Sequence, residues 1–181
     1  MNISSLKSKV ELYKETLENT KEYRSKWEPE VKPLIIKTLE NLNKKTGLGA
    51  KIDTKQNLEN MEVIVLDLGK EESGIKEMIP DSELRRELIK SNGALIFQQM
   101  FNGKIMVMIL YPHIEGYGEP RPPKNVEIVR PHELNEGYIY RYFDELIKEV
   151  TDWEDYDDDQ PTVNKIGFGT QQMIMQENTA S

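Results

Sequence analysis

The 181-residue chain contains no cysteine. It can therefore form no disulfide, use no thiolate nucleophile and build no cysteine-ligated zinc or iron–sulfur centre. Histidine is almost as scarce, because His113 and His132 are the only two and neither lies in an HExxH pattern. A three-histidine zinc site is excluded on the same ground. A chain without cysteine is typical of a reducing compartment, and we predict a cytoplasmic protein with no cofactor.

Sequence motifs for nucleotide binding and nucleophilic hydrolysis are also missing. There is no GxSxG and no GKS or GKT, and the glycine pairs 116/118 and 167/169 lack the third glycine of a dinucleotide loop. No apolar run approaches the 18 residues that a membrane span needs, and the first fifteen residues mix Lys, Glu and Ser where a signal peptide needs apolar ones. We expect neither a nucleotide cofactor nor a membrane partner.

Acidic residues are in excess, with 32 Asp and Glu against 24 Lys and Arg and a net charge of -8. A surface of this sign repels a phosphate backbone, so a nucleic-acid partner is not expected. The excess is uneven. Residues 1–59 carry 12 basic and 9 acidic groups (+3), and residues 60–181 carry 12 basic and 23 acidic groups (-11).

The N-terminal part of the chain has the periodicity of helices. Apolar residues recur at spacings of 3 and 4 over residues 3–28, where the polar faces carry charges at ion-pair spacing. Pro29 and Pro33 interrupt this pattern. A second helix is predicted from Pro33 to Gly47, with Lys44 and Lys45 in its last turn.

The middle of the chain is dominated by strand patterns. Strands are predicted over 48–54 and 61–68, followed by a short helix over 81–90 that Asp81 caps and Asn92-Gly93 ends. The next two strands, 94–101 and 104–111, are separated by Asn102-Gly103, the strongest signal for a two-residue hairpin turn. A further strand near 126–129 and a helix over 136–153 complete the pattern.

These elements predict an α+β fold with the order α-α-β-β-α-β-β-β-α. We expect a largely antiparallel sheet of four to five strands flanked by helices, in a single domain over residues 1–159. Within it, residues 1–47 supply two helices, 48–130 the sheet, and 131–159 the C-terminal helix with its acidic end. Residues 160–181 are predicted to be a polar tail.

A two-residue turn would fix the register of the central hairpin and therefore its two faces. One face would be aliphatic, with Ile96, Ile105, Val107 and Ile109. The other would be softer because methionine and aromatic groups adapt to varied contacts, and it would carry Leu95 and the four predicted partner-binding residues Phe97, Met106, Met108 and Leu110. We predict that this softer face, or the long N-terminal helix laid across it, forms a homodimer or receives a protein partner. The alternative is that the chain's own helices cover both faces.

The Gly- and Pro-rich loop 112–124 is the one place where groups for acid–base chemistry gather. His113, Glu115, Glu119 and Arg121 could serve there as acid, base and anion clamp, which would make the protein a small hydrolase or ligand-binding enzyme. The other interpretation is a surface loop stiffened by proline and aromatic packing.

The acidic segment after the last helix resembles the start of a calcium loop, because Asp155, Asp157 and Asp159 alternate along the chain. The pattern then fails, since Gln160 stands where the sharp turn needs glycine and Ile166 where a bidentate glutamate should close the shell. We therefore expect a solvated acidic segment and no metal site.

Taken together, the sequence favours a non-catalytic protein-interaction module, such as an adaptor, scaffold or chaperone-like protein. It would associate with itself and present a sheet face or an acidic surface to a protein partner. The enzyme with a site on loop 112–124 is the alternative.

Overall fold

The computed structural model describes residues 3–56 and 58–156, and the predicted tail 160–181 lies outside them. The chain starts with helix α1 (Ile3–Lys26), passes through one π-helical turn, η1 (Trp27–Val31), and continues as α2 (Lys32–Thr46). In η1 the Lys32 N–H donates to the carbonyl of Trp27, five residues back. Pro29 has no N–H and its ring crowds the preceding turn, which accounts for the local change of helix type at the predicted interruption. Gly47 ends α2 in the left-handed conformation.

The main sheet has five strands in the order β1-β2-β5-β6-β8, and every neighbouring pair is antiparallel. Its strands are β1 (Lys51–Gln56), β2 (Glu62–Asp67), β5 (Ala94–Gln99), β6 (Ile105–Leu110) and β8 (Lys124–Val129). A second antiparallel sheet has the order β3-β4-β7, from β3 (Lys70–Met78), β4 (Arg85–Ser91) and β7 (His113–Ile114).

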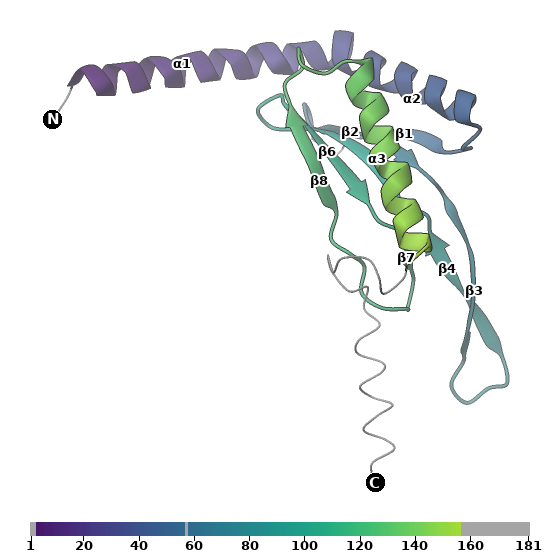
Figure 1. Cartoon of the computed structure of the whole chain (residues 1–181). Helices are drawn as coiled ribbons and strands as arrows, with labels where there is room; N and C mark the ends of the chain where they lie inside the picture. The colour runs from purple at the N-terminus through teal and green to yellow at the C-terminus, as the bar shows by residue number, and fades with distance from the viewer. Residues whose placement is uncertain (1–2, 57, 157–181) are drawn as a thin grey trace.

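The β3–β4 ribbon prolongs the β2–β5 pair instead of covering it. The two pairs join at Gly69 and Gly93, where the Leu68 N–H donates to the Gly93 carbonyl and the Asn92 N–H to the Gly69 carbonyl, at 3.0 and 2.9 Å. Both glycines have positive φ, which suits the bend between the two sheets. The ribbon projects from the body of the molecule (Figure 1), and the faces of the five-stranded sheet are not covered by it.

The core lies between one face of the five-stranded sheet and the helices α2 and α3 (Glu136–Glu154). Asn135 caps α3 by accepting a hydrogen bond from the Tyr138 N–H. The fully buried side chains alternate along the strands and recur at helical spacing in the helices, and include Ile35, Leu39, Ile64, Leu66, Leu95, Phe97, Ile105, Ile109, Ile139, Tyr142 and Leu146. Figure 1 shows α3 lying along the sheet, with α2 near the upper end of α3. No described helix is both long enough and apolar enough to cross a membrane.

The predicted α+β class with a largely antiparallel sheet is confirmed, and helices precede and follow the strands as expected. The helix predicted over 81–90 is wrong, because these residues form the turn before β4 and most of that strand. The spacing of Leu84 and Leu88 fits a helix, but strand pairing brings Glu77 opposite Arg86 and Lys76 opposite Glu87. Both pairs form ion pairs, at 2.7 and 3.8 Å, so cross-strand contacts override the local preference.

The central hairpin exists, but its turn is one residue longer than predicted. The Met100 N–H donates to the Lys104 carbonyl at 2.8 Å, which leaves three residues, 101–103, in the turn. Gly103 has a φ of 75°, whereas Asn102 is not among the residues with positive φ, so the type I′ geometry is not formed. The register therefore shifts by one, and Leu95 pairs with Ile109 and Phe97 with Val107.

Helix α1 does not lie across the sheet as suggested from the sequence. It projects away from the body, and only its last turns touch the rest of the chain (Figure 1). There Arg24 Nε donates to the Phe101 carbonyl at 2.8 Å, and the Tyr23 ring lies 5.9 Å from that of His132. A Cβ on Gly103 would come within 2.6 Å of the Arg24 backbone nitrogen, so α1 is seated directly on the hairpin turn.

Candidate interaction site

One face of the five-stranded sheet has a largely apolar centre and has no helix on it in the described part of the chain. We call it the outer face and define it by Val63, Val65, Ile96, Met106, Met108, Leu110 and Ile128. Strand pairing places these side chains together, since Val65 is opposite Ile96 and Ile96 is opposite Met108. Met106 is likewise opposite Ile128. The helices α2 and α3 pack on the other face, which carries the core.

The outer face is partly accessible to solvent. Ile128 is 52% and Leu110 36% exposed, and the residues between them are half-buried by their neighbours in the sheet. Two of the seven side chains are methionines, which are flexible and polarisable and can adapt to a contacting surface. Gln98 lies among them, opposite both Val63 and Met106, so the apolar surface is interrupted at one position. Exposed apolar surface on a sheet marks a candidate protein-contact site.

Three of the four predicted partner-binding residues, Met106, Met108 and Leu110, lie together on the outer face. The fourth, Phe97, does not. It is completely buried on the core face, where its ring meets that of Tyr142 edge-on at 6.0 Å. The one-residue change in hairpin register explains the error, because such a slip moves a side chain to the opposite face of the sheet.

The four residues of the alternative enzyme site do not share a set of contacts. His113 belongs to the short strand β7 and pairs with Ser91. The exposed carboxylate of Glu115 lies 3.2 Å from Lys70 Nζ, and the Arg121 guanidinium stacks 3.8 Å above the ring of Tyr111. Glu119 is exposed. The surface-loop interpretation stays a prediction beside the enzyme alternative.

The three candidate calcium ligands are only partly described. Asp155 is the exposed C-cap residue of α3, and Asp157 and Asp159 lie outside the described residues. Within residues 3–56 and 58–156, no group of three or more His, Asp or Glu side chains is arranged to hold a metal ion.

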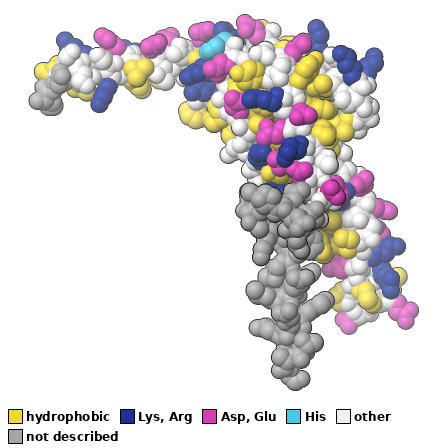
Figure 2. Space-filling view, viewed as in Figure 1, with side chains coloured by type: hydrophobic (Ala, Val, Ile, Leu, Met, Phe, Trp, Pro, Cys, Tyr) yellow, Lys and Arg dark blue, Asp and Glu magenta, His cyan; other side chains and the backbone are white. Residues whose placement is uncertain are grey.

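Three of the six acidic residues of α3 form ion pairs with lysines of the sheets. Lys124 of β8 contacts Glu145 at 2.9 Å and Glu149 at 2.5 Å, and Lys90 of β4 contacts Glu154 at 2.6 Å. Burial by itself lowers the pKa of Lys124, but the hydrogen bonds to both glutamates outweigh it and hold the pKa above its usual value. Figure 2 shows acidic and basic side chains mixed over this side of the molecule. This face is therefore less acidic than the sequence suggests.

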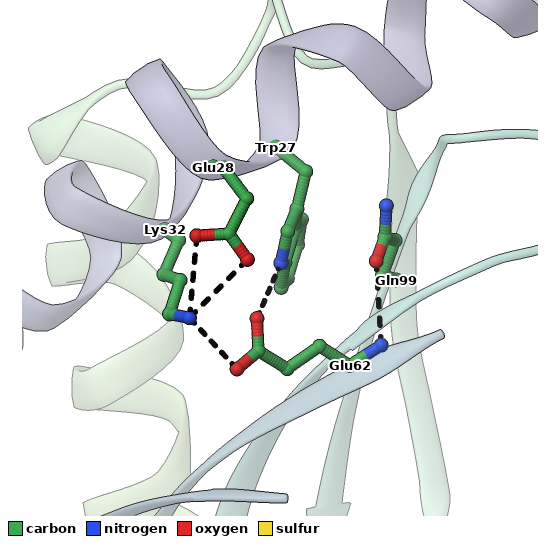
Figure 3. A network of polar contacts seen from close by, with 5 residues as sticks. All are labelled: Trp27, Glu28, Lys32, Glu62 and Gln99. Atoms are coloured by element: carbon green, nitrogen blue, oxygen red, sulfur yellow. Dashed lines mark hydrogen bonds and ion pairs between the residues drawn. The ribbon is translucent and has the colours of Figure 1, made fainter. Parts of the chain in front are cut away.

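A buried polar network connects η1 and α2 to the main sheet (Figure 3). Glu62 of β2 is 5% exposed and points toward the helices. Its carboxylate accepts a hydrogen bond from Trp27 Nε1 at 2.8 Å and lies 2.8 Å from Lys32 Nζ. The Glu62 N–H donates to Gln99 Oε1 at 3.3 Å, and Lys32 also contacts the exposed Glu28 at 3.3 Å.

The ionised form of Glu62 is favoured within this network. Burial raises the pKa of the carboxyl group, but the hydrogen bonds from Lys32 and Trp27 outweigh burial and bring the pKa below its usual value. Sequence reasoning missed the network. A signal was present, because Glu62 is the charged residue at an inward position of an otherwise apolar strand. We assign the network a structural role, since it fixes the helix turn to the sheet.

Comparison with known proteins gives no family for this chain. No family model matches it, and neither a curated protein nor a solved structure shows a significant similarity. The functional argument therefore depends on the surfaces described above.

Proposed function

We propose that the protein is a non-catalytic interaction module that associates with itself through the outer face. The observation that carries this proposal is the apolar side of the five-stranded sheet, which the described helices leave uncovered. Closing this face against a second copy would remove its apolar side chains from water, the main favourable term in association.

The charges around the outer face are compatible with a symmetric contact. On its β1 side Lys51 and Asp53 neutralise each other at 2.8 Å, and Asp67 of β2 stands opposite Lys51. A face with charges of both signs can meet its own copy without strong repulsion, as a two-fold interface requires. The acidic surface is the weaker candidate because three of the six α3 carboxylates are engaged by Lys90 and Lys124.

A lysine at position 108 tests the proposal. Met108→Lys places a charge in the middle of the outer face, where a lysine in the monomer can extend its ammonium group to water. We expect the variant to stay folded and its dimer dissociation constant to rise at least about tenfold, or 1.4 kcal/mol. Sedimentation equilibrium gives the constant, and circular dichroism checks the fold.

The matched control is Tyr140→Lys, the same new charge at an apolar position of α3 that is 40% exposed. It should leave the dissociation constant unchanged. Equal constants for wild type and Met108→Lys would contradict the proposal, as would equal weakening by the two variants. Unfolding of Met108→Lys would show that the outer face is internal core.

A further inference from the structure

Helix α1 carries a second uncovered apolar surface, separate from the outer face. Five of its apolar residues, 44 to 65% exposed, follow one side of the helix at spacings of 3 and 4. We call this stripe the α1 seam; its members are Ile3, Leu6, Val10, Tyr13 and Leu17. The spacing is that of positions a and d of a coiled-coil heptad. Apolar side chains are visible along the projecting helix in Figure 2.

The α1 seam ends where α1 begins to contact its own protein. The next heptad positions are Thr20 and Arg24, which are polar, and the residues that become half-buried start at Asn19. The part of α1 before Asn19 is therefore a projecting arm with no buried residue. A polar helix of this length is marginally stable in water by itself, so packing against another surface would stabilise it.

Lysines border the α1 seam on both sides. With Ile3 at position a and Leu6 at position d, the e positions are Lys7, Lys14 and Lys21, and the g positions along the seam are Lys9 and the neutral Thr16. The glutamates of α1 lie further round the helix, and Glu18 forms an ion pair with Lys21 at 2.8 Å. The charged side chains directly beside the seam are therefore all basic.

This charge pattern disfavours pairing of α1 with a second α1. In a parallel pair, Lys9 of one helix would face Lys14 of the other, and in an antiparallel pair the e positions would place lysine against lysine. The outer face of a second copy offers no acidic border to these lysines either, because its β1 edge carries Lys51 and Lys55 beside Asp53 and Asp67. A second copy of this chain is therefore not the matching occupant.

We propose that the α1 seam pairs with an amphipathic helix of a different protein, one whose apolar seam is bordered by acidic residues. Charges beside a coiled-coil seam select the partner, and a glutamate-bordered helix would turn each lysine of α1 into an attractive contact. The seam is one residue wide at each turn and the opposite face of α1 carries four glutamates, which favours a helix over an anionic lipid surface.

The test is a titration of the full-length protein with two synthetic helical peptides. Both have three heptads with the same leucine and isoleucine seam, but one carries Glu and the other Lys at positions e and g. We expect the Glu peptide to bind at least about tenfold more tightly, with an affinity that falls as salt is raised. Fluorescence anisotropy of labelled peptide reports binding.

Two variants make the titration specific to the α1 seam. Val10→Asp interrupts the seam and should abolish binding of the Glu peptide. Leu12→Asp makes the same change at a residue that is 63% exposed on the opposite side of the helix, and should leave binding unchanged. The double variant Lys7→Glu/Lys14→Glu should reverse the preference toward the Lys peptide.

Equal binding of both peptides would overturn the charge argument, and no binding of the Glu peptide would overturn the proposal. Binding to phosphatidylserine vesicles but not to the Glu peptide would identify a lipid surface and also overturn it. The result is independent of self-association through the outer face, because Met108→Lys should bind the Glu peptide as wild type does.

Discussion

Replacing Phe97 with alanine is expected to lower the free energy of unfolding by about 3 to 5 kcal/mol, the usual cost of deleting a buried aromatic side chain. Phe97 is 0% exposed, stacks edge-on against Tyr142 and stands opposite Val107 on the core face. The truncation would leave a cavity between the sheet and α3. Urea unfolding monitored by circular dichroism measures the change.

Met108→Ala is the control for Phe97→Ala, and both should be measured at a protein concentration low enough for the monomer. Met108 is a half-buried residue of the neighbouring strand that faces the other way, so its truncation should cost clearly less. Had the hairpin the two-residue turn predicted from Asn102-Gly103, Phe97 and Met108 would share one face. Similar losses for the two variants would therefore contradict the observed register.

Glu62→Ala is expected to destabilise the protein by about 3 kcal/mol, because it removes the acceptor of the buried Trp27 N–H and the closer of the two carboxylates that contact Lys32. The change would leave Trp27 Nε1 without its acceptor and Lys32 with the exposed Glu28. The control is Glu28→Ala. Its carboxylate touches the same lysine but its side chain is 69% exposed, so we expect a loss of less than about 1 kcal/mol.

The contribution of Glu62 should also depend on pH. Because its pKa is lower in the folded protein than the usual value of 4.5, its ionisation stabilises the fold at neutral pH. This contribution is complete above the unfolded value and is lost as the pH falls through the folded one. The difference in unfolding free energy between wild type and Glu62→Ala should therefore shrink below pH 4.5. A difference that stays constant to lower pH would contradict the assigned pKa direction.

The parts of the fold that sequence patterns predicted are those with strong local periodicity. The helix ending at Gly47, the strand around Ile64 and the C-terminal helix all have an apolar face that repeats at one period. β3 and β4 were missed because most of their residues are charged, and the pairing of Glu77 with Arg86 becomes visible only when two strands meet. Such cross-strand contacts carry no periodic signal in either segment alone.

The candidate site was predicted in part for a related reason. Alternation along a strand correctly grouped Met106, Met108 and Leu110. The face of Phe97 depended on the register, which a single residue in the turn decides, and Asn102-Gly103 is compatible with both turn lengths. The projection of α1 away from the sheet was not encoded in its periodicity, because an apolar stripe predicts that a helix needs a partner without saying where the partner lies.

The central claim, self-association through the outer face, is tested most directly by the mass of the wild-type protein in solution. Light scattering coupled to size-exclusion chromatography measures it over a dilution series in the micromolar range. We expect a mass near twice the 21.1 kDa of the chain at the highest concentration, falling toward 21.1 kDa on dilution. A mass of 21.1 kDa at every concentration would contradict the claim.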